Sequence, residues 1–147
     1  MKSTFVERLN MLEKVDHIAI AVNSLQESLF LYETLLGFQF LGRETIEEQG
    51  VEVAKLSLGG CIIELLSPLS SESPVAKFIQ KRGPGIHHIA LKAMKLEETV
   101  EELKKKGIRF TTDAPMRGAG GCQIIFMDPQ NTLNVLFELT TGHKNSC

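Results

Sequence analysis

Cysteine is scarce in this chain of 147 residues. The three cysteines, Cys61, Cys122 and Cys147, lie far apart, which excludes a disulfide framework and a Cys-x-x-Cys metal clip. No apolar run reaches the about 20 residues of a membrane span, and residues 1–8 lack the apolar core of a secretion signal. We therefore expect a cytoplasmic protein with reduced thiols and no membrane partner.

Neither sign of charge is in large excess. Sixteen Lys and Arg stand against eighteen Asp and Glu, for a net charge of −2. Nothing in this balance favours nucleic acid or an anionic membrane surface as a partner. With 43% apolar residues, a chain of this length can bury about two thirds of the surface that it exposes when unfolded. A compact protein that binds a small molecule is expected.

An internal repeat is the most informative feature of the sequence. Residues 16–22, Asp-His-Ile-Ala-Ile-Ala-Val, return as residues 87–93, His-His-Ile-Ala-Leu-Lys-Ala. Each copy is followed by a helix-like stretch and a glycine, and later by a short apolar segment that contains one glutamate. The chain therefore reads as two halves with the same order of elements.

Hydrophobic periodicity and turn residues predict the order βαβββ in each half, which makes the fold class α+β. The expected elements of the first half are a strand at 15–22, a helix at 25–36 capped by Ser24, and strands at 38–44, 51–58 and 61–66. Those of the second half are a strand at 86–93, a helix at 96–106, and strands at 108–111, 123–127 and 133–140. A linker with a short helix at 74–81 joins them. We expect an N-terminal appendage at 1–12 and a single domain at 13–147, with halves at about 13–67 and 86–141.

One histidine and one glutamate occupy corresponding places in the two halves. Aligning the repeats pairs His17 with His88, and leaves His87 on the opposite face of its strand because side chains alternate. Glu64 and Glu138 lie in otherwise apolar strands, where a buried carboxylate costs several kcal/mol unless it is paired or bound to a metal. Any one of these residues alone is more often structural. Their joint repetition indicates two half-sites that meet at one metal ion.

Two imidazoles and two carboxylates suit a divalent first-row ion, with Co, Zn, Ni and Mn all compatible. The ligand set does not select among these four ions. It leaves coordination positions for water or a substrate.

The repeat and these ligands resemble the vicinal-oxygen-chelate superfamily, which includes glyoxalase I, extradiol dioxygenases and methylmalonyl-CoA epimerases. The segments that most resemble the epimerases are residues 64–68 (Glu-Leu-Leu-Ser-Pro), 73–79, 85–90 (Gly-Ile-His-His-Ile-Ala), 118–121 and 137–139. The resemblance runs from about residue 15 to residue 141. It implies duplicated βαβββ modules that form a curled mixed sheet around a metal cleft, usually in a homodimer.

By this resemblance the metal ligands carry over to His17, Glu64, His88 and Glu138. The implied reaction is the interconversion of the C2 epimers of methylmalonyl-CoA, an acyl-CoA substrate, through a metal-stabilised enolate. Glu64 and Glu138, one from each half, are then the two bases that face opposite sides of the carbon.

Some positions depart from the epimerase pattern. Asp128 and Asn134 stand where the family commonly has histidine and glycine. Some epimerases carry glutamine at the position of Glu64 and a separate glutamate where this chain has Val53, so Glu64 is expected to take over that acid-base role.

The sequence does not decide which residues contact the CoA phosphates. The candidates are the basic side chains Lys77, Lys81, Arg82 and Arg117 and the glycine-rich stretch 118–121.

Two other functions stay open. A glyoxalase I-like lactoylglutathione lyase shares the ligand set and also transfers a proton beside a metal. A binding or resistance protein of this fold would be non-catalytic, and the retention of all four ligands weighs against it. The fourth ligand also argues against an extradiol dioxygenase, which uses two histidines and one carboxylate.

Overall fold

A computed structural model describes residues 11–142, and the contacts of its chain divide it into two compact units. The central unit comprises residues 17–88, and the flanking unit comprises residues 11–16 and 89–142. Strands β1 (Leu12–Ala21) and β5 (Gly85–Ala93) each contribute residues to both units. The predicted appendage at 1–12 lies outside the described residues except for its last two positions, of which Leu12 begins β1.

The central unit holds four neighbouring strands in the order β2-β3-β4-β1. β2 pairs antiparallel with β3, β3 pairs antiparallel with β4, and β4 runs parallel to β1. Its other elements are α2 (Leu25–Leu29), η2 (Phe30–Leu35), β2 (Gln39–Ile46), η3 (Glu47–Gln49), β3 (Val51–Leu58), β4 (Cys61–Pro68) and α3 (Pro74–Arg82). The predicted order of strand, helix and three strands is confirmed for this half, and so is the short linker helix.

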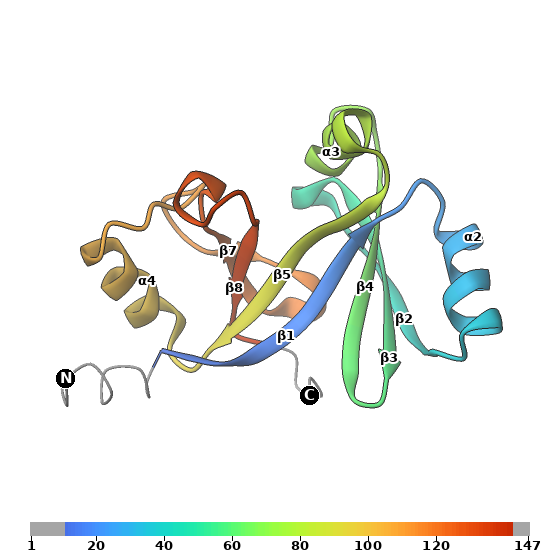
Figure 1. The fold of residues 1–147 in the computed structure, drawn as a ribbon, viewed down its shortest axis with the longest axis horizontal. Coiled ribbons are helices and arrows are strands. Elements are labelled where there is room, and N and C mark those ends of the chain that lie inside the picture. Colours follow the sequence, from blue (N-terminus) through green and yellow to red (C-terminus); the bar gives the residue numbers. More distant parts are fainter. Residues whose placement is uncertain (1–10, 143–147) are drawn as a thin grey trace. The chain divides into compact units, whose positions relative to one another are not determined.

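One face of these strands packs against α2, which lies beside them in Figure 1. The buried residues of this cluster are Val22, Leu25, Ala54, Leu56 and Leu65. Because side chains alternate along a strand, the neighbours of these core residues on β1, β3 and β4 point to the other face of the sheet. That second face carries the candidate ligands.

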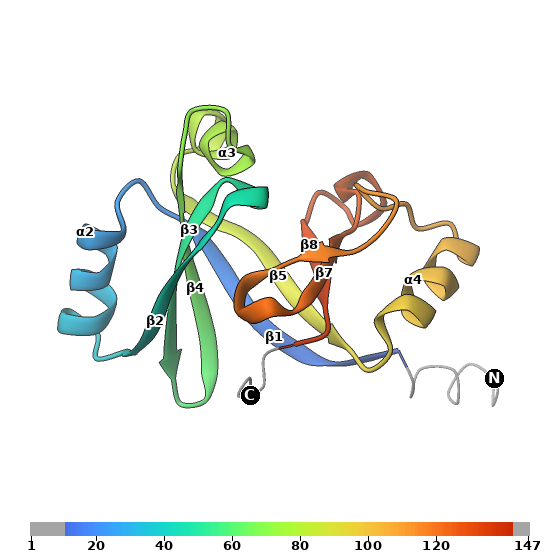
Figure 2. The ribbon, with the colours of Figure 1, turned by 180° about the vertical axis from the view of Figure 1, so that it is seen from behind.

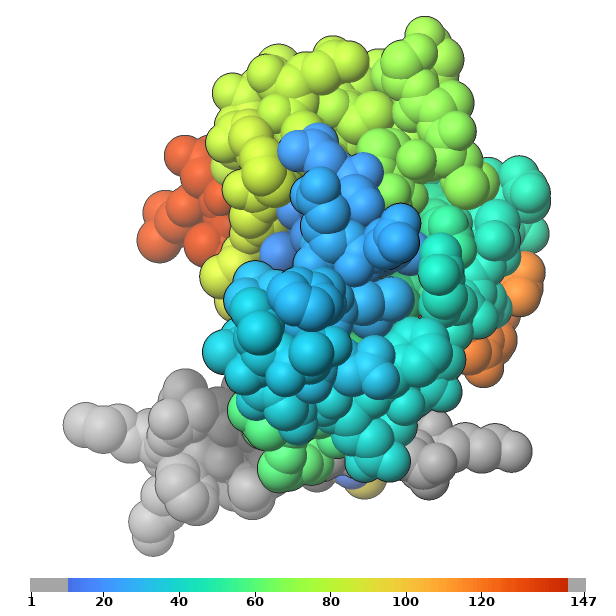
Figure 3. Space-filling model, turned by 90° about the vertical axis from the view of Figure 1, so that its right-hand side faces the viewer, coloured from blue at the N-terminus to red at the C-terminus, as the bar shows by residue number. Residues whose placement is uncertain are grey.

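The helix after β1 begins where the sequence predicts. Ser24 accepts a hydrogen bond from the backbone N–H of Glu27 at 3.3 Å, as an N-cap residue does. From Phe30 onward the helix widens to a π-helical turn, in which the N–H of Leu36 donates to the carbonyl of Leu31 at 2.9 Å. Leu36, which follows this turn, is 54% exposed. Figure 3 shows the outer surface of this helix.

The flanking unit repeats the plan with the order β5-β8-β7-β6. β5 runs parallel to β8, and the remaining pairs are antiparallel. Its own elements are α4 (Leu96–Lys105), β6 (Met116–Arg117), η4 (Ala119–Gly121), β7 (Gln123–Phe126), η5 (Pro129–Asn131) and β8 (Phe137–Thr140). α4 packs with Val100 and Leu96 against Ile125 and Leu139, and Figure 2 shows this helix beside its strands.

Two predicted strands of the second half are wrong in part. Residues 108–111 form no ladder, only an isolated bridge between Phe110 and Met127, because the chain bends immediately afterwards. The strand expected at 133–140 begins only at Phe137, since Leu133 and Asn134 both have positive φ, 56° and 69°, which no strand accommodates. The short strand β6 was not predicted. Among the described residues, no helix is long and apolar enough to cross a membrane.

Candidate functional site

Strand register brings the first histidine and the first glutamate together. Ala19 on β1 is the Cα partner of Glu64 on the parallel strand β4, and His17 lies two residues before Ala19 on the same face. The two neighbours of Glu64 on β4, Ile63 and Leu65, point to the other face and pack in the cluster that includes Leu25 of α2. The sequence thus places an imidazole diagonally next to a carboxylate, with the fully buried Ala19 leaving space beside them.

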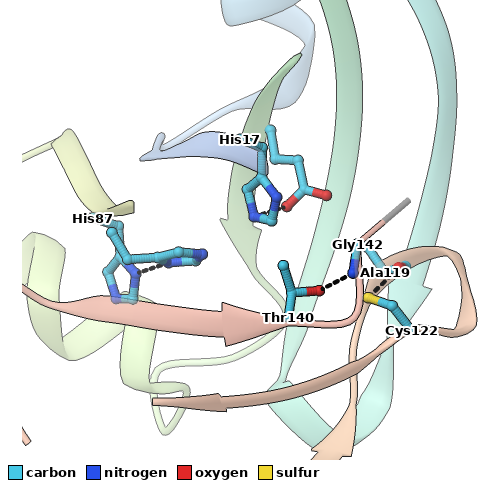
Figure 4. A network of polar contacts seen from close by, with 8 residues as sticks. His17, His87, Ala119, Cys122, Thr140 and Gly142 are labelled. Atoms are coloured by element: carbon cyan, nitrogen blue, oxygen red, sulfur yellow. Dashed lines mark hydrogen bonds and ion pairs between the residues drawn. The ribbon is translucent and has the colours of Figure 1, made fainter. Parts of the chain in front are cut away.

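The structure groups three of the four predicted ligands in the central unit. Nε2 of His17 lies 2.9 Å from Oε2 of Glu64, a contact drawn in Figure 4. The rings of His17 and His88 lie with their centroids 5.6 Å apart, edge to face. All three residues are buried, as are Nε2 of each histidine and Oε1 of Glu64. Two imidazoles and a carboxylate therefore lie together away from solvent.

Glu138 occupies the equivalent position in the flanking unit. It is the Cα partner of Ala90 on the parallel strand β5, and His88 precedes Ala90 by two residues, as His17 precedes Ala19. Glu138 is buried, on the face opposite the one that packs against α4. His17, His88 and Glu138 are thus three buried residues that each offer a metal-ligand atom. The repeat seen in the sequence is a repeat of strand register.

His87 lies against His88. The two Nδ1 atoms are 2.9 Å apart, a contact drawn beside the label of His87 in Figure 4. The His87 ring also meets the ring of Phe78 on α3, with centroids 4.9 Å apart. Burial, and secondarily the neighbouring His88, lower the pKa of His87 from 6.5 to about 4. His87 is therefore neutral near pH 7.

Lys55 lies on the face of the sheet that carries the candidate ligands, and the sequence analysis did not single it out. It is the direct antiparallel partner of Glu64 across β3 and β4, so both side chains point to the same face of the sheet. Lys55 is half-buried, whereas Glu64 is buried. The apolar and polar alternation of residues 51–58 could have indicated this lysine, because it shares its face with Val53 and not with the core residue Leu56.

The basic residues considered for CoA are all exposed. Lys77, Lys81 and Arg82 belong to α3, and the Arg82 guanidinium lies 5.8 Å from the centroid of the Phe78 ring. Arg117 lies on β6 in the flanking unit. Exposure alone does not show that any of these side chains binds CoA, so their roles stay predictions.

Comparison with known proteins identifies the protein superfamily to which this chain belongs. Residues 16–126 match the family model of the glyoxalase/bleomycin resistance protein/dioxygenase superfamily, and the chain belongs to this superfamily. Within it, the chain is 38% identical to the human mitochondrial methylmalonyl-CoA epimerase over 129 residues, 87% of this chain and 73% of that protein. It is also 41% identical to YqjC of Bacillus subtilis, described as uncharacterized, over 87% of this chain and 91% of that one.

A solved structure gives the same result for the fold. A methylmalonyl-CoA epimerase of Streptomyces coelicolor in complex with 2-nitronate-propionyl-CoA is 34% identical, covers 89% of this chain and 98% of its own, and superposes with a TM-score of 0.84. The predicted fold class and the predicted resemblance to methylmalonyl-CoA epimerases are confirmed. The domain boundaries and the assignment of individual ligands and bases stay predictions.

Proposed function

We propose that this protein epimerises C2 of methylmalonyl-CoA. The observation that carries the proposal is the repeated register, a histidine two residues before the alanine that faces a buried glutamate, once on β1 and β4 and once on β5 and β8. Relatives that are named for this activity align with 87% to 89% of this chain. The structure of one of them holds an acyl-CoA analogue. The substrate class that follows is an acyl-CoA thioester that carries a free carboxylate on C2.

The donor set fits a divalent cation. His17, Glu64 and His88 are grouped and buried in the central unit, and Glu138 repeats the position of Glu64 in the flanking unit. Imidazole nitrogens and carboxylate oxygens together suit Co²⁺, Zn²⁺, Ni²⁺ or Mn²⁺. We propose that all four residues hold one such ion. When bound, the ion would supply Lewis acidity toward the negative charge that develops as C2 loses its proton.

The two glutamates are the proposed bases. Epimerisation removes the C2 proton from one face and returns a proton to the other, so one base on each face is required. Val53, where some epimerases carry glutamate, is apolar and buried on the face that Glu64 shares. Glu64 is the one carboxylate of β4 and lies on that same face, and Glu138 is its counterpart in the other half. A carboxylate that holds a cation would be a weaker base, because the cation stabilises its ionised form.

Incorporation of solvent deuterium tests the proposal. In D₂O, the metal-loaded protein should exchange the C2 proton of methylmalonyl-CoA and convert one pure epimer to a mixture of both. The same preparation is offered the hemithioacetal of methylglyoxal and glutathione. Consumption of the hemithioacetal without exchange at C2 would replace the epimerase proposal by the glyoxalase I-like alternative, because both reactions use the same kind of ligand set.

A further inference from the structure

His87 lies between α3 and the candidate ligand His88. On one side its ring meets Phe78 edge to face, with centroids 4.9 Å apart. On the other side its Nδ1 lies 2.9 Å from Nδ1 of His88, at hydrogen-bond distance. His87 is half-buried, and both rings lie at the start of β5. Its imidazole is thus held by neighbours on two sides.

The Nδ1 to Nδ1 contact restricts the protons of the two rings. Two imidazoles form a hydrogen bond through these atoms only when one Nδ1 carries a proton and the other offers a lone pair. A ring has two nitrogens, and since Nδ1 of His88 faces His87, a cation would be bound through Nε2 of His88. A neutral imidazole that binds a cation through Nε2 carries its proton on Nδ1. The donor is then His88 and the acceptor is His87.

We propose that His87 is a positioning residue for His88, and this inference rests on the metal site of the proposed function. Its Nδ1 accepts the hydrogen bond from the Nδ1–H of His88, which fixes the ring orientation of His88 and the tautomer that presents Nε2 to a cation. Phe78 of α3 holds the His87 ring in place. Partners of this kind usually change metal affinity by about 10- to 100-fold.

The duplication does not supply the same partner to the other histidine. The residue before His17 is Asp16, not histidine. The effect of His87 therefore belongs to one half of the site, and the loss of His87 should weaken the site without abolishing it.

Two substitutions separate the hydrogen bond from packing. His87→Phe keeps an aromatic ring against Phe78 but offers no acceptor, whereas His87→Gln loses the ring and keeps an acceptor in its side-chain carbonyl. The dissociation constant for Co²⁺ or Zn²⁺ is measured on metal-free full-length protein by competition with a chelator, and thermal unfolding checks the fold of each variant. His87→Phe should bind about 10- to 100-fold more weakly than wild type, and His87→Gln should recover most of that loss. Wild-type affinity in His87→Phe would overturn the proposal.

Nitrogen-15 NMR of the wild type gives a test that needs no variant. Long-range ¹H–¹⁵N spectra should show a protonated Nδ1 on His88 and an unprotonated Nδ1 with a protonated Nε2 on His87. The reverse assignment would overturn the role of His87 even if metal binds tightly. A wild-type protein that binds neither ion but shows the expected tautomers would contradict the proposed metal site while upholding the hydrogen bond.

Discussion

The substitutions Glu64→Gln and Glu138→Gln should separate the two proton transfers of the proposed reaction. Glutamine has the shape of glutamate and keeps one oxygen that can bind a metal, but it cannot accept the C2 proton. Glu64 is 4% exposed and its Oε2 lies 2.9 Å from Nε2 of His17, so a residue of the same size fits without new voids. The folded structure should therefore survive each change, so a loss of activity reports the metal site or the base and not the fold.

The expected magnitude follows from the role of a general base. Such a group contributes about 10² to 10⁴ in rate, which is about 3 to 5 kcal/mol of transition-state stabilisation. Each variant should thus lose at least about 100-fold in the conversion of one epimer to the other. Each should still exchange deuterium into one epimer, because the remaining base can remove and return a proton on its own face.

Pure (2R)- and (2S)-methylmalonyl-CoA in D₂O, followed by NMR or mass spectrometry, measure this difference. Glu64→Gln should label one epimer and Glu138→Gln the other, in each case faster than it epimerises. If both variants labelled the same epimer, or if Glu64→Gln epimerised at the wild-type rate, the assignment of one base to each half would be wrong.

The remaining predictions concern the metal, the substrate charge and pH. His17→Ala and His88→Ala should each lose stoichiometric metal, measured by elemental analysis, while circular dichroism stays that of a folded protein; full metal content in both would refute the shared site. Lys55→Met removes a positively charged side chain directly across from Glu64. It should raise the KM for the anionic substrate about 5-fold with little change in kcat, since a partly exposed charge contact is worth about 1 kcal/mol. An unchanged KM would exclude Lys55 from substrate binding. The pKa of His87 falls from 6.5 to about 4 on folding, so the unfolded chain binds this proton first as the pH drops below 6.5. The free energy of unfolding of the metal-free protein should therefore decrease between pH 6.5 and 4, by at most about 3 kcal/mol. Urea titrations should show that this decrease is absent in His87→Phe.

The sequence predicts most elements because their signals are local. The glycine turn between β3 and β4, the Ser24 cap and the glycines that end helices each depend on a few neighbouring residues. The errors fall where the backbone departs from regular geometry. The π-helical turn η2 keeps a helical pattern in the sequence, and the paired positive φ angles at Leu133 and Asn134 interrupt an apolar run that reads as strand.

The candidate site is predictable where strand register determines it. The repeat alone pairs His17 with His88 and indicates their glutamates, because both halves use the same parallel pairing. The contact between His87 and His88 was not predictable from alternation, which places adjacent residues on opposite faces. It depends on ring rotation at the start of β5 and on Phe78, which a separate helix supplies. Lys55 was missed because its partnership with Glu64 requires the register of β3 against β4.

The same register explains why the two faces of each unit have different chemistry. A parallel pair such as β1 and β4 cannot be joined by a tight turn, so the chain must cross over, and the crossover includes a helix that covers one face. In both units that helix packs on the leucine next to the glutamate, Leu65 in one and Leu139 in the other. Each glutamate must then point to the uncovered face, beside a fully buried alanine, Ala19 or Ala90. Small residues at these positions leave room next to each carboxylate, where a bound cation would help to offset the cost of burying acids in duplicate.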